Sequence, residues 1–223
     1  IEEQEMAGAS VVPFRVQEGD DASCLNLNHA QIPAVAGVDP AGLASREAFS
    51  FKAVSSLVTV ADGASPWTIL DAKLEDGAVP AVMDANSAMY ALKVKLGDTI
   101  PYVDGKGNTV PIKLVGTLNN ALLQGKVVIS EGNFIDHFPD AAGYRYFLID
   151  AEPDKEEALG AMLTRQLGLR GLALTSAAAR LAQFNAVQNT YIGIFSTLGA
   201  FALVLSTVGL GILVARNVLE RRA

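Results

Sequence analysis

Residues 191–215 read YIGIFSTLGAFALVLSTVGLGILVA and contain no Asp, Glu, Lys or Arg over 25 positions. A helix of this length measures about 37 Å at ~1.5 Å per residue, against about 30 Å for the hydrocarbon core of a bilayer. The alternative is the buried core helix of a soluble domain, but such helices rarely remain uncharged for so long. The pattern therefore predicts a transmembrane helix over 191–215.

The charges on either side of this stretch are unequal. Arg216, Arg221 and Arg222 follow it within eight residues, whereas the fifteen residues before it hold only Arg180. Cytoplasmic flanks of membrane helices carry an excess of Lys and Arg. We therefore expect 216–223 to be the start of a cytoplasmic segment. The chain from 1 to about 190 is then extracytoplasmic.

Small side chains recur along one side of the predicted membrane helix. Gly199, Ala202, Ser206 and Gly209 stand at spacings of i, i+3, i+7 and i+10, which places them on one helix face. Such a face lets a second membrane helix approach closely. The ordinary Gly and Ala content of membrane helices is the alternative explanation. We interpret the stripe as a packing face in a membrane domain of several helices.

The segment before the membrane helix continues the helical pattern. Residues 176–190 (SAAARLAQFNAVQNT) are rich in helix formers and contain neither Pro nor Gly. We predict a single helix from about Ala177 to Val218, whose first part, 177–190, is a stalk helix outside the bilayer. A rigid rod of this kind can carry motion between an outer domain and the membrane.

The chain before the stalk has the mixed pattern of an α+β domain. Tyr144–Asp150 is predicted as a strand, followed by a helix that begins at an Asp154 cap, with Glu157 in a capping box, and ends at Gly168. Leu169–Leu174 is predicted as the next strand. These elements form a β-α-β unit that leads directly into the stalk helix.

The remaining elements suggest two lobes. Segments 1–75 and 142–176 are assigned to an extracytoplasmic β-α-β lobe, and 76–141 to an inserted, smaller β-rich lobe that contains a hairpin with strands near 98–103 and 108–118. Residues 24–40 are interpreted as a long ordered loop within the first lobe.

Charge and cysteine content exclude some classes of protein. Residues 1–190 contain 14 basic and 23 acidic residues, a balance of −9, which argues against a nucleic-acid partner. The single cysteine, Cys24, permits no disulfide within the chain and is interpreted as a small buried apolar residue. Both ends of the sequence look cut, so we expect it to be part of a longer protein.

No pattern in the sequence predicts catalysis or cofactor binding. His29 and His137 lack metal-ligand spacing to each other and to Cys24. The stretch GKGNT at 105–109 does not fit a phosphate-binding loop, and Asp136-His137 has no serine elbow to support a hydrolytic role. We expect no catalytic, cofactor-binding or metal-binding residue and no enzyme activity in this chain.

Two long stretches resemble one family of membrane proteins. Residues 189–222, NTYIGIFSTLGAFALVLSTVGLGILVARNVLERR, resemble the start of the membrane domain of FtsX-like ABC transporter permeases, with their Gly-Leu-Gly and Arg-Asn-Val-Leu-Glu-Arg-Arg ending. Residues 79–150 look like the MacB-type extracytoplasmic domain of this family, as in macrolide exporters and lipoprotein-releasing permeases. The stretch DDASCLNL at 20–27 is also associated with long permeases of this type.

The resemblance implies a function and a set of partners. It implies a permease subunit of the bacterial cytoplasmic (inner) membrane that couples ATP hydrolysis by a partner ABC ATPase to export or to mechanical work in the envelope. The ATP would be bound by that partner, and this chain would need no cofactor. Other implied partners are the lipid bilayer, a second permease subunit in a dimer, and envelope proteins. Two alternatives are a single-span anchored binding or sensor module without an ATPase, and an anchored envelope enzyme.

Overall fold

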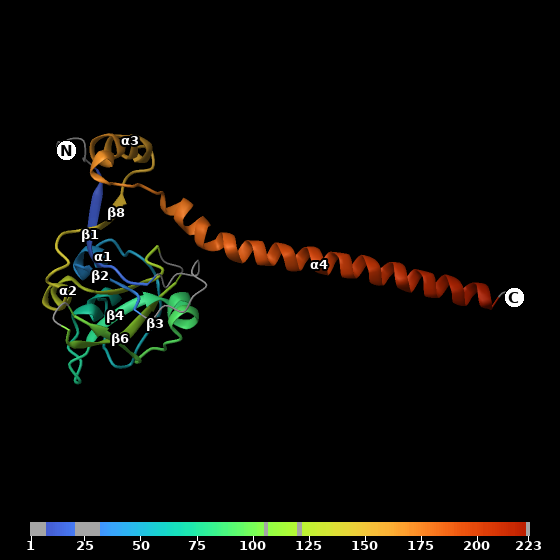
Figure 1. The fold of residues 1–223 in the computed structure, drawn as a ribbon, viewed down its shortest axis with the longest axis horizontal. Coiled ribbons are helices and arrows are strands. Elements are labelled where there is room, and N and C mark those ends of the chain that lie inside the picture. Colours follow the sequence, from blue (N-terminus) through green and yellow to red (C-terminus); the bar gives the residue numbers. More distant parts are fainter. Residues whose placement is uncertain (1–7, 21–31, 105–106, 120–121, 222–223) are drawn as a thin grey trace. The chain divides into compact units, whose positions relative to one another are not determined.

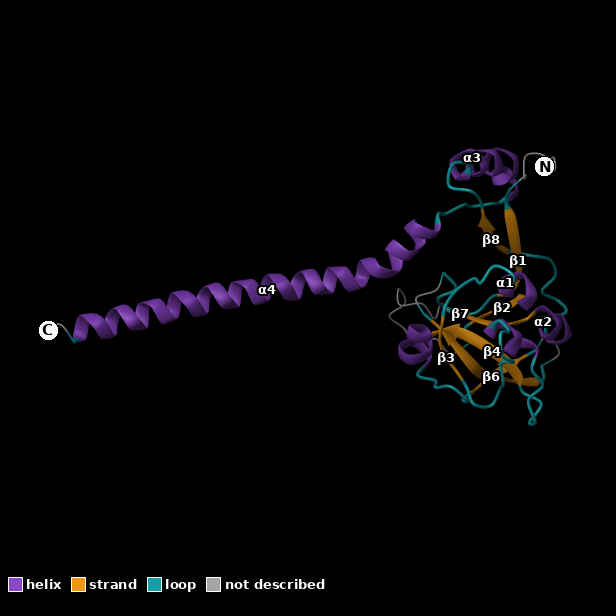
Figure 2. Ribbon diagram, turned by 180° about the vertical axis from the view of Figure 1, so that it is seen from behind, coloured by secondary structure: helices purple, strands orange, loops and turns teal. Residues whose placement is uncertain are grey.

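A mixed β-sheet forms the centre of the part of the chain before the long C-terminal helix in the computed structural model. The structure describes residues 8–20, 32–104, 107–119 and 122–221. The chain divides into two units, Ile1–Ala177 and Ala178–Ala223. The first unit, called the water-facing unit below, contains the sheet with its helices. The second unit is helical (Figures 1 and 2). The α+β class is therefore confirmed.

The strands of the described part form one sheet in the order β3-β6-β4-β7-β2-β1-β8, with β5 paired to β6. The pairs β2–β7 and β4–β6 are parallel, and the other pairs are antiparallel. The strands are β1 (Ser10–Gln17), β2 (Ala34–Val38), β3 (Phe51–Val54), β4 (Val79–Asp84), β5 (Thr99–Val103), β6 (Thr109–Leu118), β7 (Lys126–Ser130) and β8 (Tyr146–Asp150).

Hydrophobic side chains cover both faces of the sheet centre. In β2, Ala36 and Val38 belong to one buried cluster, whereas Val35 belongs to the other, because alternate side chains of a strand point to opposite faces. The first cluster includes Trp67, and the second includes Phe134. Burial on both faces explains why β4 is buried at all of its positions.

Short helices close these two faces, and three of them begin at a residue whose side chain caps the helix. They are α1 (Pro40–Ala44), η1 (Pro66–Asp71), η2 (Ser87–Leu92) and α2 (Glu131–His137). Asp39 and Ser65 cap α1 and η1 ahead of a proline, and Ser130 Oγ accepts the backbone N–H of Asn133 at the start of α2.

One close contact fixes α2 on the sheet. A Cβ at Gly37 in β2 would lie 2.4 Å from the Cβ of Phe134 in α2. Only a glycine at this position lets the fully buried Phe134 ring lie directly on the strand.

The long interval predicted as a loop over 24–40 contains strand β2. Residues 34–38 (AVAGV) pair in parallel with β7, so the loop prediction is wrong for this part. Five residues with a Gly are a weak local strand signal, and the pairing partner stands about 90 residues later in the sequence. Cys24 lies outside the described residues.

The strand predicted over Leu169–Leu174 is also wrong. After α3 (Glu156–Leu167), residues 168–170 form a 3₁₀ turn, η3 (Gly168–Arg170). Gly171 has a positive φ of 92°, and its N–H bonds to the Gly168 carbonyl at 3.0 Å. This turn stops regular structure before a strand can begin. Leu169 is fully exposed.

The helix predicted before this turn is present, but its predicted cap is wrong. α3 begins at Glu156, with Lys155 at the N-cap position and no side-chain capping bond. The Lys155 Nζ instead pairs with Glu152 Oε2 at 2.6 Å. Glu156 and Glu157 still place negative charge in the first turn, where it favours the helix.

The division into an outer lobe and an inserted lobe at 76–141 stays a prediction. The sheet continues across the proposed boundaries through the pairs β3–β6 and β2–β7. Strand β1 pairs with β8 along Ser10–Phe14 and with β2 along Phe14–Gln17. It therefore joins β8, and the chain that follows β8, to the rest of the sheet.

Candidate functional site

The helix α4 (Ala177–Glu220) is the first candidate functional element. It runs without interruption for 44 residues, as the sequence pattern predicts (Figure 2). Within it, Asn189–Glu220 is long and apolar enough to cross a membrane, with a mean hydropathy of 2.3 in its most apolar window and no buried residue there. Large apolar side chains are exposed along 191–214. Such a helix is expected in lipid rather than in water.

Threonine hydroxyls in this helix satisfy their own hydrogen bonds. Thr190, Thr197 and Thr207 each donate to the carbonyl oxygen four residues earlier, at 2.8 Å in every case. A polar group without a partner costs several kcal/mol in the hydrocarbon region. These bonds let the span carry hydroxyls without requiring a polar neighbour.

The predicted packing face lies on the exposed surface of α4. Gly199, Ala202, Ser206 and Gly209 are all exposed. A Cβ added at Gly199 or Gly209 would meet no atom of the described chain within 4 Å. The face is thus open to a second helix, and its role in packing stays a prediction.

The basic flank is partly neutralised by a local ion pair. Arg216 Nε lies 2.7 Å from Glu220 Oε1, one turn later in the same helix. Arg221 is exposed beyond this pair, and Arg222 lies outside the described residues. At the other end of the helix, the Arg180 guanidinium lies over the Phe184 ring at 4.6 Å and donates to Gln183. The cytoplasmic assignment of the flank stays a prediction.

A cluster of three polar side chains connects β1, α2 and the segment that leads into β8. Arg15 Nε and the Tyr144 hydroxyl both donate to Glu131 Oε1 at 2.8 Å, and the Arg15 guanidinium lies 4.8 Å from the Tyr144 ring centroid. Hydrogen bonding to Glu131 raises the pKa of Arg15 and of Tyr144. The sequence gives no signal for this cluster, because its members are up to 129 residues apart.

A second polar cluster lies in the interior. The Asp84 carboxylate is fully buried at the end of β4, and its Oδ1 accepts the N–H groups of Asn86 and Ser87 at 2.9 and 3.1 Å. The same oxygen lies 3.4 Å from Gln124 Nε2, and Ser87 Oγ accepts the Gly125 N–H at 3.0 Å. These bonds attach the segment before β7 to the start of η2.

A pocket of about 480 Å³ brings together several of the polar residues considered above, including Ser130, Asp136 and His137. Asp71 also lines it, and partial burial, aided by the charge of Asp39, raises the Asp71 pKa. Ser130 Oγ is engaged by Asn133 through its backbone and side-chain nitrogens at 3.4 and 2.9 Å. The serine therefore serves as a helix cap, and this arrangement does not support a nucleophile paired with His137.

Among the residues that the structure describes, no three or more His, Cys, Asp or Glu side chains lie together in a way that could hold a metal ion. His29 and Cys24 lie outside that part of the chain. Of the hairpin turn at 104–107, Asp104 and Gly107 are described, and the Gly107 N–H bonds to the Asp104 carbonyl at 3.1 Å.

No protein-family model matches the sequence, and no curated protein sequence matches it. Among solved structures, the chain is similar to the periplasmic region of MacB from Actinobacillus actinomycetemcomitans, at 14% identity and a TM-score of 0.37, with 71% of this chain and 67% of that chain covered. It is also similar to the extracellular domain of the ABC-type transporter YknZ from Gram-positive bacteria, at 13% identity and a TM-score of 0.39, with 74% and 83% covered.

Both matches have identities of 13–14% and TM-scores below 0.5, so the function is inferred below from the residues of this chain.

Proposed function

We propose that this chain is the extracytoplasmic domain and the following transmembrane helix of an ABC transporter permease subunit. In this proposal a partner ATPase on the cytoplasmic side hydrolyses ATP, and the permease subunit converts its movements into export or mechanical work in the cell envelope. Another helix of the membrane domain packs against the face formed by Gly199, Ala202, Ser206 and Gly209, and a second permease subunit completes a dimer. The proposal also places residues 1 to about 190 outside the bacterial cytoplasmic membrane.

The continuity of α4 is the observation that carries the proposal. One helix of 44 residues includes both a polar stalk and the uncharged stretch 191–215. A helix transmits an axial displacement or a rotation along its length because every turn is hydrogen-bonded to the next. A simple membrane anchor needs no such stiff extension beyond the bilayer. The resemblance of 189–222 to FtsX-like permeases supports the same assignment.

The first experiment tests orientation in the membrane. Cys24→Ala removes the native thiol. Ser56→Cys then introduces a single exposed thiol in the first unit, and Arg221→Cys introduces one after the predicted membrane span. A membrane-impermeant maleimide added to intact spheroplasts should label Ser56→Cys. It should label Arg221→Cys only after the membrane is permeabilised. Labelling of both thiols in intact spheroplasts would refute the proposed orientation.

The second experiment tests coupling to an ATPase. The full-length protein should co-purify with an ABC ATPase encoded beside it, and disabling ATP hydrolysis in that ATPase should abolish the function of the pair. A protein that keeps its function without an ATPase would instead be a single-span binding or sensor module.

A further inference from the structure

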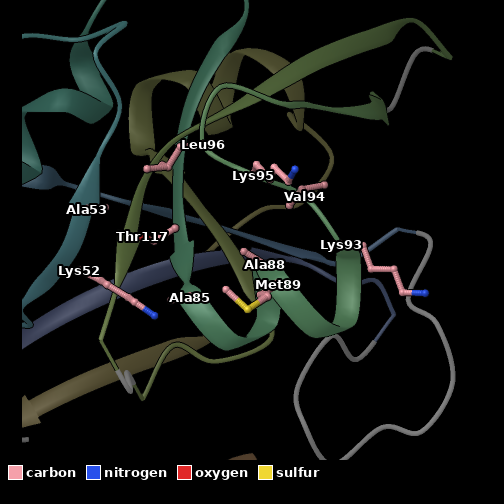
Figure 3. Close-up of a pocket in the computed structure, with 10 residues that line it drawn as sticks. All are labelled: Lys52, Ala53, Ala85, Ala88, Met89, Lys93, Val94, Lys95, Leu96 and Thr117. Carbon is pink, nitrogen blue, oxygen red and sulfur yellow. The ribbon is translucent and has the colours of Figure 1, made fainter.

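A pocket on the water-facing unit combines an apolar floor with basic residues at its rim. It has a volume of about 410 Å³ and lies between β3, the start and end of η2, and the chain that leads into β5 (Figure 3). This volume is within the range of small-molecule sites. Its lining residues are Lys52, Ala53, Ala85, Ala88, Met89, Lys93, Val94, Lys95, Leu96 and Thr117.

The backbone after η2 builds one wall of this pocket. Lys93 adopts a left-handed conformation with a φ of 57°, and the Val94 N–H bonds to the Ala88 carbonyl at 2.9 Å. This reversal brings Val94 and Leu96 to the same hollow as Ala88. A non-glycine residue in this conformation costs about 1 kcal/mol or more, so packing in the folded chain must hold it there.

Apolar side chains near the pocket are left open to solvent. Met89 and Tyr90 on η2 are 55% and 72% exposed, and Leu57, whose side chain lies near Gly97, is 54% exposed. Exposed apolar side chains beside a hollow of this size indicate a binding surface. The unbranched, polarizable Met89 can adapt to a flexible chain.

The charge at the rim is opposite to that of the chain as a whole. Lys52, Lys93 and Lys95 are all exposed, and the ten described residues that line the pocket include no acid. Figure 3 shows Lys52 on one side of Met89 and Lys93 on the other, with Lys95 above Met89. The nearby carboxylate of Asp98 accepts the backbone N–H of Lys95 at 2.8 Å. Three ammonium groups in a domain of balance −9 favour an anionic ligand.

The backbone at the pocket wall is already hydrogen-bonded. The N–H groups of Val94, Lys95 and Gly97 donate to the Ala88 carbonyl, the Asp98 carboxylate and the Leu114 carbonyl, respectively. A peptide that binds by adding a strand needs free backbone groups along an edge. Recognition at this wall therefore depends on hydrocarbon contacts and on ammonium groups.

We propose that this pocket binds an anionic amphiphile, with its alkyl chain on Ala88, Met89, Val94 and Leu96 and its phosphate or carboxylate head beside the rim lysines. The inference goes beyond the proposed function. It concerns the class of ligand and does not depend on coupling to an ATPase.

The test uses the full chain in phosphatidylcholine nanodiscs. The probe is dodecyl phosphate with a diazirine on its alkyl chain, and labelled positions are mapped by peptide mass spectrometry. Labelling is expected on the peptides that contain Met89 and Val94–Leu96, and unlabelled dodecyl phosphate should compete for it. Dodecanol lacks the charge and should compete at least about tenfold less well, because it forms no charge-assisted hydrogen bonds with the lysines.

Three variants separate specific binding from partition into lipid. K52E/K93E/K95E should weaken competition by dodecyl phosphate at least about tenfold. The matched triple variant K73E/R165E/R170E replaces three exposed basic residues outside the pocket with Glu. It changes the net charge by the same amount and should leave binding unchanged. Ala53→Trp fills the pocket from an exposed position in β3 and should block labelling without disturbing the interior.

Four results would overturn the inference. The first three are labelling confined to the membrane helix, equal competition by dodecanol and dodecyl phosphate, and equal binding by the two triple variants. Competition by an Asp-rich peptide but not by dodecyl phosphate would also overturn it and would assign the pocket to an acidic protein partner.

Discussion

The stalk part of α4 is expected to depend on the membrane part for its helical structure. Residues 177–190 amount to 14 residues, or about 21 Å of helix. Isolated helices shorter than about 12–15 residues are marginal in water. The stalk should therefore be helical mainly because it continues from a helix that the bilayer stabilises.

Asn185→Pro tests this dependence at an exposed position within the stalk. Proline removes the backbone bond to the Leu181 carbonyl and clashes with that carbonyl, at a cost of about 3 kcal/mol. The segment on the far side of the break, 177–184, is then only eight residues long. A cost of 3 kcal/mol corresponds to a roughly hundredfold change in the opening equilibrium.

The assay is amide hydrogen exchange of the full chain in nanodiscs. In Asn185→Pro, the amides of 181–184 should exchange about a hundredfold faster than in the control Asn185→Ala, while those of 195–215 stay protected. Under the proposed function, activity that depends on a partner ATPase should be lost in the proline variant and kept in the alanine variant. If 181–184 stay equally protected in both variants, continuity with the membrane helix does not stabilise the stalk and the reasoning is refuted.

Three further predictions concern the water-facing unit. Gly37→Ala should lower the free energy of unfolding by about 1–3 kcal/mol in urea titrations, because the new methyl group would overlap Phe134. Removing Arg15 and Glu131 singly and together should give a favourable coupling free energy in a double-mutant cycle, and it should shrink as salt is added. Asp84→Ala should cost about 1–3 kcal/mol for each buried donor left unpaired, and Asp84→Asn should cost less because it keeps an acceptor oxygen.

Each of these predictions has a control. Gly132→Ala changes a glycine in α2 where a Cβ would meet nothing within 4 Å, and it should leave stability unchanged or raise it by up to about 1 kcal/mol. If Gly37→Ala lowered the free energy of unfolding no more than Gly132→Ala does, the close approach of Phe134 to position 37 would be refuted. A coupling of zero for Arg15 and Glu131 would mean that their ion pair does not form in solution. Equal stabilities of the two Asp84 variants would show that its acceptor oxygens contribute nothing.

The elements with a strong local signal are predictable from the sequence. The lack of charge over 191–215 and the absence of Pro and Gly from 176–190 define α4 to within two residues at its end. Strand β4 is predictable from its run of apolar residues, and β6 is predictable from the alternation of apolar and polar residues along it. In these cases the information lies within a single window of the chain.

Failures occur where a turn or a distant partner decides the structure. Leu169–Leu174 has strand-like composition, but the positive φ of Gly171 ends regular structure there. Conversely, β2 has weak composition, and its pairing with β7 makes it a strand. The pocket lysines come from β3 and from the turn after η2, about 40 residues apart, so no local pattern predicts their proximity.

The way in which β8 joins the sheet has a mechanical consequence for the proposed function. In the described part of the chain, β8 pairs only with β1, through five residue pairs from Ser10↔Asp150 to Phe14↔Tyr146. A pull on the C-terminal end of β8 along the strand axis draws it past β1, which is held at its other end by β2. The ladder is then loaded in shear, and its hydrogen bonds resist together instead of opening one after another. Under such a load, β8 and β1 would move as one body with the sheet.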